Sequence, residues 1–247
     1  LSRRPDDQPA LTGASFAAWW AFDYAATLPL LRRLLALRPG DLYGTLYRGS
    51  NRLFLGDAGG AADLTRAILL APHSADVRFI VADAYTYAQP DPARAQAEAT
   101  LALSLGLDTP RVQAILASAA FALGDPQAGA AHLERHIALS TSDHPSIAPL
   151  APGSTVSVDL IPGRSYDIPL VLAAGQALSI RTSSPSGEID DSVAVLLAPD
   201  GTPVAGNDDL VGFYAGLDWT APQAGTYTLR VTSFEGVGTG NLVVQRE

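Results

Sequence analysis

Apolar residues follow two different periods along this chain, and the change falls near residues 145–152. Before it, apolar positions recur every three to four residues, as on one face of a helix. After it, they alternate with polar positions in short runs bounded by Gly, Pro and Asp, as in half-buried strands. The pattern predicts a multidomain α plus β protein, with an N-terminal α-solenoid of helical hairpins and a C-terminal antiparallel β-sandwich.

The first part is expected to consist of paired helices over residues 14–144, after a polar tail at 1–13. A degenerate first pair covers residues 16–39. The apolar pattern predicts six further helices, over residues 42–55, 61–70, 77–87, 93–105, 112–123 and 128–139. The second helix of each pair ends near residue 39, 72, 107 or 141, so the hairpins repeat every 33 to 35 residues.

This pitch and the residues at the turns resemble the tetratricopeptide repeat. Gly56-Asp57 and Gly124-Asp125 fall at the turn within a pair, and Pro39 and Pro72 follow second helices. The full Trp-Leu-Gly-Tyr pattern of that repeat is absent, so a generic helical-hairpin solenoid is the alternative. Arrays of this kind stack into a superhelix whose inner surface, lined by first helices, holds a peptide or protein.

Candidate partner-binding residues follow from projecting the repeat onto that inner surface. They are Tyr43, Ser50, Asp83, Tyr87, Arg111 and Ser118. Trp19 and Trp20 join them, because adjacent residues lie about 100° apart on a helix and both rings do not easily enter one core stripe. The alternatives are ordinary solvated face residues and, for the tryptophans, burial in the core.

The second part, residues 154–247, is predicted to be a sandwich of seven or eight strands, joined to the helices by a linker at 145–153. Apolar residues alternate within the segments 156–160, 168–172, 178–180, 193–197, 217–219, 227–231 and 242–244. Turn residues such as Pro162-Gly163 separate them, and no helical pattern intervenes.

Several motifs here, in order and spacing, resemble the bacterial pre-peptidase C-terminal domain. They are Tyr166-Asp167-Ile168-Pro169-Leu170, Ala174-Gly175-Gln176, Pro199-Asp200-Gly201, Asn207-Asp208-Asp209 and the run from Ala224 to Val231. That family consists of jelly-roll-like modules appended to secreted bacterial proteins. The resemblance implies an accessory role and an extracellular or cell-envelope location after removal of a signal peptide. With no peptidase domain in the chain, it does not imply proteolysis.

An acidic cluster in the same part is the candidate metal site. Asp190 and Asp191 precede one expected strand, and Asn207, Asp208 and Asp209 follow the next. Oxygen ligands on loops suit Ca²⁺, and the resemblance points the same way, because some members of the family bind calcium at comparable positions. The alternative is that these residues serve turns and caps.

Composition narrows the function classes. The chain has 247 residues, 47% hydrophobic, with no Cys and a net charge of −9, and all its basic residues are Arg. Residues 147–247 hold 11 acidic and 4 basic residues, so a basic face for nucleic acid is not expected. No apolar run reaches the roughly 18–20 residues that span a bilayer.

Catalytic residues are not expected. The two parts carry neither a Gly-x-Ser-x-Gly elbow nor a His-Glu-x-x-His motif, and His132 and His136, one turn apart on one helix, are expected on a solvated face. The sequence therefore predicts a non-catalytic secreted or cell-surface module that binds or assembles proteins. A structural subunit of an extracellular assembly, built through edge strands and the N-terminal tail, is the alternative, and an accessory part of a secreted hydrolase is a weaker one.

Overall fold

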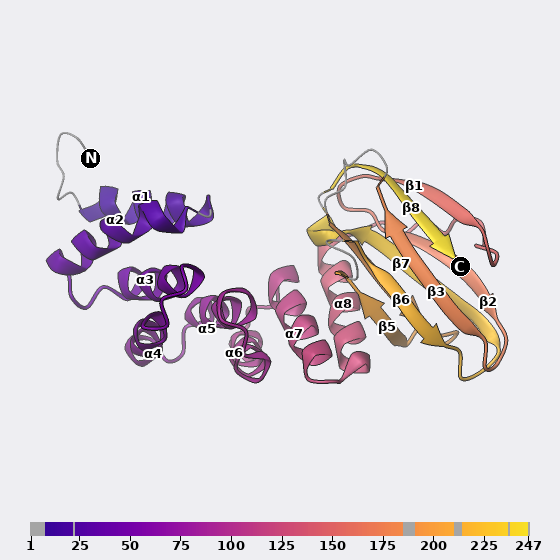
Figure 1. Ribbon diagram of the computed structural model, residues 1–247, viewed down its shortest axis with the longest axis horizontal. Coiled ribbons are helices and arrows are strands. Elements are labelled where there is room, and N and C mark those ends of the chain that lie inside the picture. Colours follow the sequence, from indigo (N-terminus) through magenta and orange to yellow (C-terminus); the bar gives the residue numbers. More distant parts are fainter. Residues whose placement is uncertain (1–7, 22, 185–190, 210–213, 237, 247) are drawn as a thin grey trace. The chain divides into compact units, whose positions relative to one another are not determined.

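The computed structural model describes residues 8–21, 23–184, 191–209, 214–236 and 238–246 (Figure 1). The chain divides into two compact units, Leu1–Asp108 and Thr109–Glu247. The expected fold class is confirmed, because helices fill the first part and two antiparallel four-stranded sheets fill the second. The boundary between the units, however, falls before the last helical hairpin and not after it.

The described residues of the first unit form six α-helices that pack as sequential pairs. They are α1 (Gln8–Trp20), α2 (Tyr24–Leu37), α3 (Leu42–Phe54), α4 (Gly60–Leu70), α5 (Ala75–Asp83) and α6 (Pro92–Ser104). Helix α1 thus begins inside the segment expected as a polar tail.

Short polar side chains set where these helices begin. The Asp41 and Asp91 carboxylates and the Ser74 hydroxyl each accept a hydrogen bond from a backbone N–H three residues on, at 2.7, 3.1 and 3.4 Å. Each satisfies one of the amides that the first helical turn leaves unpaired. The same residue types that interrupt the apolar pattern in the sequence therefore place the helices.

Gly49 allows α3 and α4 to pack backbone against backbone. A Cβ atom at this position would lie 2.9 Å from the backbone nitrogen of Leu64. Beside this contact, the buried Asp63 carboxylate accepts hydrogen bonds from Arg48 Nε and Nη2 at 2.9 and 2.6 Å, and from Arg52 at 3.1 Å. The pair is therefore fixed by close packing and a bidentate ion pair.

A π-helical turn, η1 (Ala84–Ala88), continues α5. This turn lies in the second complete hairpin. Asp91 lies 17 residues after the capping residue Ser74, whereas Asp125 lies 16 residues after the capping residue Thr109. The π-helical turn thus occurs in the hairpin with the longer of these two spacings.

The second unit begins with a helical hairpin, α7 (Pro110–Ala122) and α8 (Pro126–Ser140), and its described residues continue with eight strands. The strands are β1 (Thr155–Leu160), β2 (Tyr166–Leu172), β3 (Ala177–Ser183), β4 (Ser192–Leu197), β5 (Pro203–Asn207), β6 (Gly216–Thr220), β7 (Gly225–Ser233) and β8 (Gly240–Arg246). One sheet has the order β1-β8-β3-β6 and the other β2-β7-β4-β5, and all their pairs are antiparallel. Apolar side chains between the sheets form the sandwich core.

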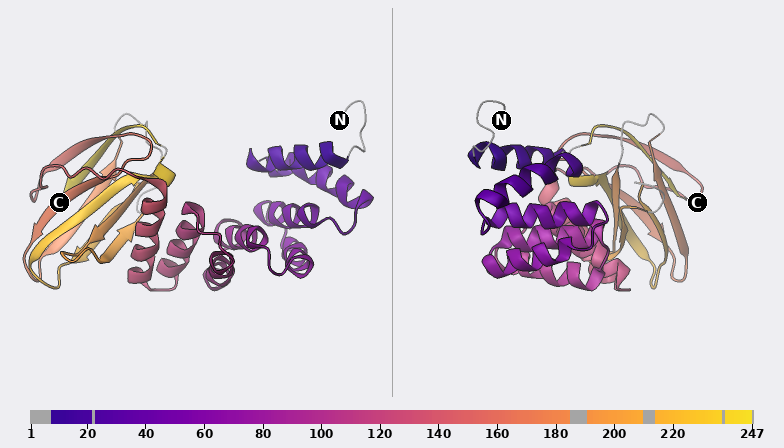
Figure 2. Two further views of the ribbon diagram at one scale, coloured as in Figure 1. Left: turned by 180° about the vertical axis from the view of Figure 1, so that it is seen from behind. Right: turned by 60° about the vertical axis from the view of Figure 1, so that its left-hand side comes forward.

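The hairpin α7–α8 lies against the sandwich and covers the outer face of β4 and β5 (Figure 2). Every residue of β4 is buried, so this strand has no solvent-facing side. Leu133 and Ile137 of α8 pack in one cluster with Val193 and Val195. The hairpin is therefore part of the sandwich domain's core, although its sequence belongs to the helical pattern.

Polar contacts and a glycine reinforce this packing. Arg230 on β7 is bound by Glu134 of α8 and by Asp167 of β2, whose oxygens lie 2.7 and 2.8 Å from Arg230 Nε and Nη2. Gly206 lets β5 approach the helix, because a Cβ there would lie 3.1 Å from Leu133 Cδ1. Strand β5 has no clear apolar alternation, which explains why the apolar pattern alone identifies seven strand segments and not this eighth one.

The segment expected as a linker, 145–153, is largely held against the sheet. Residues 143–150, which overlap this segment, run parallel to β2. Asp167 N donates to Pro145 O at 3.0 Å, and Leu150 N donates to Pro169 O at 3.1 Å. Backbone pairing of this kind covers the edge of β2. Apolar periodicity does not detect it, because the segment contains three prolines and pairs at few positions.

We expect residues 109–247 to fold on their own and residues 142–247 not to. The shorter chain keeps the segment along β2 but lacks α7 and α8, which exposes the apolar outer face of β4 to water. Thermal unfolding followed by circular dichroism, with dye binding to exposed apolar surface, measures the difference. An equally high melting temperature for both chains would contradict the assignment of the hairpin to the sandwich core.

Candidate binding site

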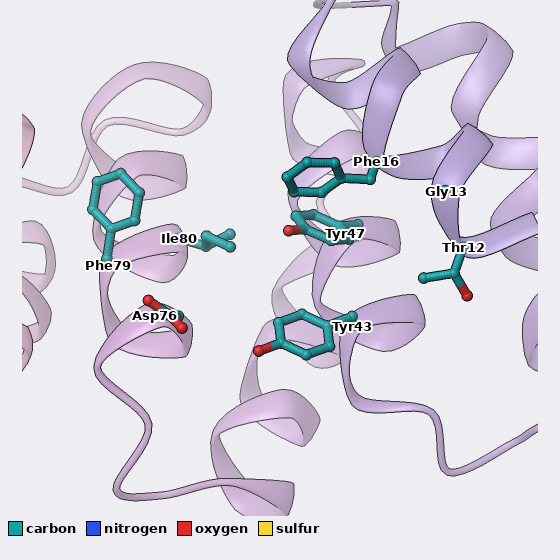
Figure 3. A pocket seen from close by; sticks show the side chains of 8 residues that line it. All are labelled: Thr12, Gly13, Phe16, Tyr43, Tyr47, Asp76, Phe79 and Ile80. Carbon is teal, nitrogen blue, oxygen red and sulfur yellow. The ribbon is translucent and has the colours of Figure 1, made fainter. Parts of the chain in front are cut away.

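A pocket of about 540 Å³ lies among the first helices of the first unit (Figure 3). It is lined by Thr12, Gly13 and Phe16 of α1, Tyr43 and Tyr47 of α3, and Asp76, Phe79 and Ile80 of α5. The side chains of α5 face those of α1 and α3 across the open space. Because α1, α3 and α5 are each the first helix of a pair, the pocket lies on the face where the sequence predicted binding.

Three aromatic rings form one wall, which we call the aromatic wall (Phe16, Tyr43 and Tyr47). Phe16 meets Tyr47 edge to face, and Tyr43 stacks on Tyr47, with centroids 6.1 Å apart in both pairs. Tyr47 is 7% exposed, but Phe16 and Tyr43 are 46% and 42% exposed. Neighbouring exposed rings on a concave surface mark a site for another molecule more strongly than scattered apolar residues do.

Asp76 lies at the opposite side of the pocket, in the first turn of α5, and its side chain is exposed. The hydroxyl groups of Tyr43 and Tyr47 point toward the α5 side. Burial, together with the nearby Tyr43 and Asp76, raises the pKa of Tyr47 to about 12. The Tyr47 hydroxyl therefore stays protonated at neutral pH and can donate or accept hydrogen bonds.

The residues that the sequence predicted to bind a partner are not all exposed in the structure. Tyr43 lines the pocket and Tyr87 is 48% exposed. Ser50 and Asp83 are buried, so they are not available to a partner, because α3 packs on α5 and η1 and covers the flanks of these helices. Arg111 and Ser118 are partly buried on α7, in the second unit. The side chains of Trp19 and Trp20 lie outside the described residues.

The prediction missed Phe16, Tyr47, Asp76 and Phe79 as lining residues. A signal was present for α3, since Tyr43 and Tyr47 are one turn apart on one face. For Phe16, Asp76 and Phe79, projecting the repeat does not predict a position in the pocket, because the projection does not give the distance between one first helix and the next.

The acidic cluster is only partly described, since Asp190 lies outside the described residues. Asp191 precedes β4, and Asn207–Asp209 follow or end β5, which pairs antiparallel with β4. These residues therefore lie at the same end of the sheet, as expected. Burial, with the charge of Asp209, raises the pKa of Asp208 to about 6. Asp218 on β6 is bound by Arg181, whose Nη2 lies 2.9 Å from both carboxylate oxygens.

No group of three or more His, Cys, Asp or Glu side chains suited to a metal ion occurs among the described residues. The calcium site stays a prediction. The solvated face expected for His132 and His136 is wrong. His136 is fully buried, with Nδ1 2.9 Å from Pro110 O, and Nδ1 of the partly buried His132 lies 2.8 Å from Gln113 Oε1, because α8 packs this face on α7.

Among the described residues, none of the helices is long and apolar enough to cross a membrane.

Neither family models nor curated proteins match this chain, but solved structures resemble each of its parts. Over the helical half, MamA from Desulfovibrio magneticus RS-1 is 18% identical, with 54% of this chain and 76% of that chain covered, at a TM-score of 0.46. TTC0263, a thermophilic TPR protein in Thermus thermophilus, is 20% identical, with 56% and 77% covered and a TM-score of 0.48.

The pre-peptidase C-terminal domain of a collagenase from Bacillus anthracis is 17% identical, with 43% of this chain and 96% of that domain covered, at a TM-score of 0.34. Both resemblances stated from the sequence therefore recur among solved structures. At these identities and scores, the likeness concerns the fold and says nothing about function.

We expect Asp208→Asn to raise the melting temperature by a few degrees at pH 7.5 and to change it little at pH 4. Asp208 has a higher pKa in the folded than in the unfolded chain, so the folded state loses stability as pH rises from about 4 to about 6. Asparagine carries no charge in this pH range, so the variant does not lose that stability as pH rises. Melting curves of both proteins in chelator across this range measure it, and a difference that does not vary with pH would contradict the assignment.

The wild type and Asp208→Asn also test whether calcium binds to the acidic cluster. An ion held by these loops relieves the cost of the Asp208 carboxylate, so calcium at pH 7.5 should raise the melting temperature of the wild type by mass action and not that of Asp208→Asn. Asp159→Ala, at an exposed acid on β1, is the control that should keep the calcium response. Identical melting curves in calcium and in chelator would contradict the calcium site, and the acidic residues would then serve only turns and caps.

Proposed function

We propose that this protein is a non-catalytic module that binds a protein partner through the pocket on α1, α3 and α5. The observation that carries the proposal is the aromatic wall, because two of its three rings are largely exposed although they lie together in a concave surface. Aromatic side chains contribute large contact areas and are enriched at the energetic centres of protein interfaces.

The shape of the site favours a peptide segment over a small metabolite. The pocket is open and lies between facing walls of side chains from three helices, and only a few polar groups are present to fix a small ligand's orientation (Figure 3). A side chain or two of an extended segment would fill it while the rest of the segment follows the helices.

In this proposal the protein acts outside the cytoplasm, at the cell envelope or in the extracellular medium. The motifs of the sandwich, such as Pro199-Asp200-Gly201, support this location through their resemblance to modules of secreted bacterial proteins. The sandwich then anchors or spaces the binding unit. Fractionation of cells that carry the full gene tests the location, and recovery of the protein wholly in the cytoplasm would contradict it.

We expect peptides selected from a random displayed library on the immobilised protein to lose binding to Tyr43→Ala and to Phe79→Ala. Each change removes part of a pocket wall and should weaken affinity about tenfold or more, as expected for an aromatic residue at an interface centre. Titration by fluorescence anisotropy measures this. Leu69→Ala is the matched control, because Leu69 is 76% exposed on α4 and does not line the pocket. Selected peptides that bind both pocket variants as tightly as the wild type would contradict the proposal.

A second candidate function, assembly with further copies, is supported by one edge of the sandwich. The β2 edge is covered by residues 143–150 and β5 packs against α8. Within the described strands, β1 pairs only with β8 and β6 only with β3, and we consider the β1 edge. An unpaired edge offers backbone groups to a second strand.

We expect, under this second candidate, that the average mass in solution rises with concentration. Sedimentation velocity over a hundredfold concentration range measures it for the full chain. Because pairing at the β1 edge and binding in the pocket are separate, Tyr43→Ala should leave the self-association unchanged. A strict monomer at the highest concentration would contradict assembly.

A further inference from the structure

We propose that the pocket binds an arginine side chain of an extended segment in the partner, with the alkyl stem and guanidinium against the aromatic wall and the charge facing the Asp76 carboxylate. This inference rests on the proposed function and names the chemistry that the site selects.

The carboxylate of Asp76 is available to a ligand. It is exposed, and none of the described residues forms a hydrogen bond or ion pair with it. The arginine side chains of α5 and α3 that are nearest in sequence to the pocket residues already form hydrogen bonds with other groups. Arg78 on α5 donates to Glu98 Oε2 at 2.7 Å and to Pro72 O at 3.0 Å, and Arg48 on α3 donates to Asp63 at 2.6 Å. No basic side chain is among the described residues that line the pocket.

This acid also lies opposite aromatic rings. Tyr43 and Tyr47 turn their hydroxyls toward the α5 side, and Asp76 lies on that side (Figure 3). Cations are attracted to aromatic faces, and arginine uses this contact more often than lysine because its planar guanidinium stacks on rings. A first-turn acid also stabilises a helix through the helix dipole. That role accounts for an acid at the start of α5 but not for the aromatic residues that face it.

The opposite charge does not suit the pocket. A carboxylate or phosphate there would lie near Asp76, and the lining residues supply no cation to balance the two negative charges. Acidic segments and free C-terminal carboxylates are therefore disfavoured. The volume of about 540 Å³ exceeds what one side chain needs, so an apolar neighbour of the arginine enters as well.

The test compares three capped seven-residue peptides, Gly-Leu-Ser-Xaa-Ser-Leu-Gly, with arginine, citrulline or glutamate at the central position. Citrulline has nearly the shape of arginine but no charge. Isothermal titration on the full chain should give at least about tenfold tighter binding of the arginine peptide than of the citrulline peptide, and the weakest binding for glutamate. Raising the salt concentration should reduce the preference for arginine.

Variants then assign the preference to one residue. Asp76→Asn should bring the arginine-to-citrulline ratio close to one while the citrulline affinity stays unchanged, and Asp76→Glu should retain the preference. Asp159→Asn removes the same charge on β1, outside the pocket, and should leave the ratio as in the wild type. Melting curves of each variant show that the comparison is made on folded protein.

Two outcomes overturn the proposal in distinguishable ways. If arginine and citrulline peptides bind equally, and Tyr43→Ala weakens both, the pocket binds protein segments but does not select a cation. If the arginine peptide does not bind measurably at millimolar concentration, the cation proposal fails. The displayed-library selection, which assumes nothing about charge, then decides the proposed function by itself.

Discussion

The burial of β4 on both faces is the constraint on which the second unit depends. One face of this strand enters the core between the sheets, and the other is covered by Leu133 and Ile137 of α8. A strand whose residues are all buried cannot face water, so the sandwich requires the helical hairpin. The Arg230 contacts with Glu134 of α8 and Asp167 of β2 also link the helix to the sheet. The helical hairpin α7–α8 is therefore a structural layer of the β domain.

In the first unit, packing between successive first helices has the corresponding role. Close backbone contact at Gly49 holds α4 behind α3, and this leaves the front of α3 free to face α1 and α5. Buried positions on that front, such as Ser50, close the gaps between helices. Tyr43 and Phe16 line the pocket, and they remain exposed. The pocket thus lies between first helices of successive pairs, and its negative charge comes from the acid at the start of α5.

Parts of the candidate sites could be read from the sequence because they depend on local order. Antiparallel pairing of two neighbouring strands brings Asp191 and Asp208 to one end of the sheet, and the expected turn at 199–201 was enough to infer that. Tyr43 was found because the repeat indicates its face. The burial of His136 and Asp83 was not found, since a helix face that is solvated in one hairpin is covered in another according to the neighbour that packs on it.

The sequence by itself determined most of the helices and strands, the change of architecture near residue 145 and the repeat pitch, because these depend on apolar periods and on local caps and turns. Tertiary structure alone decided that the last hairpin belongs to the sandwich, that residues 143–150 cover the β2 edge, and that Asp76 faces an aromatic wall. Each of these is a contact between segments distant in sequence. A period along one segment reports which face is apolar, but it carries no information about which other segment covers that face.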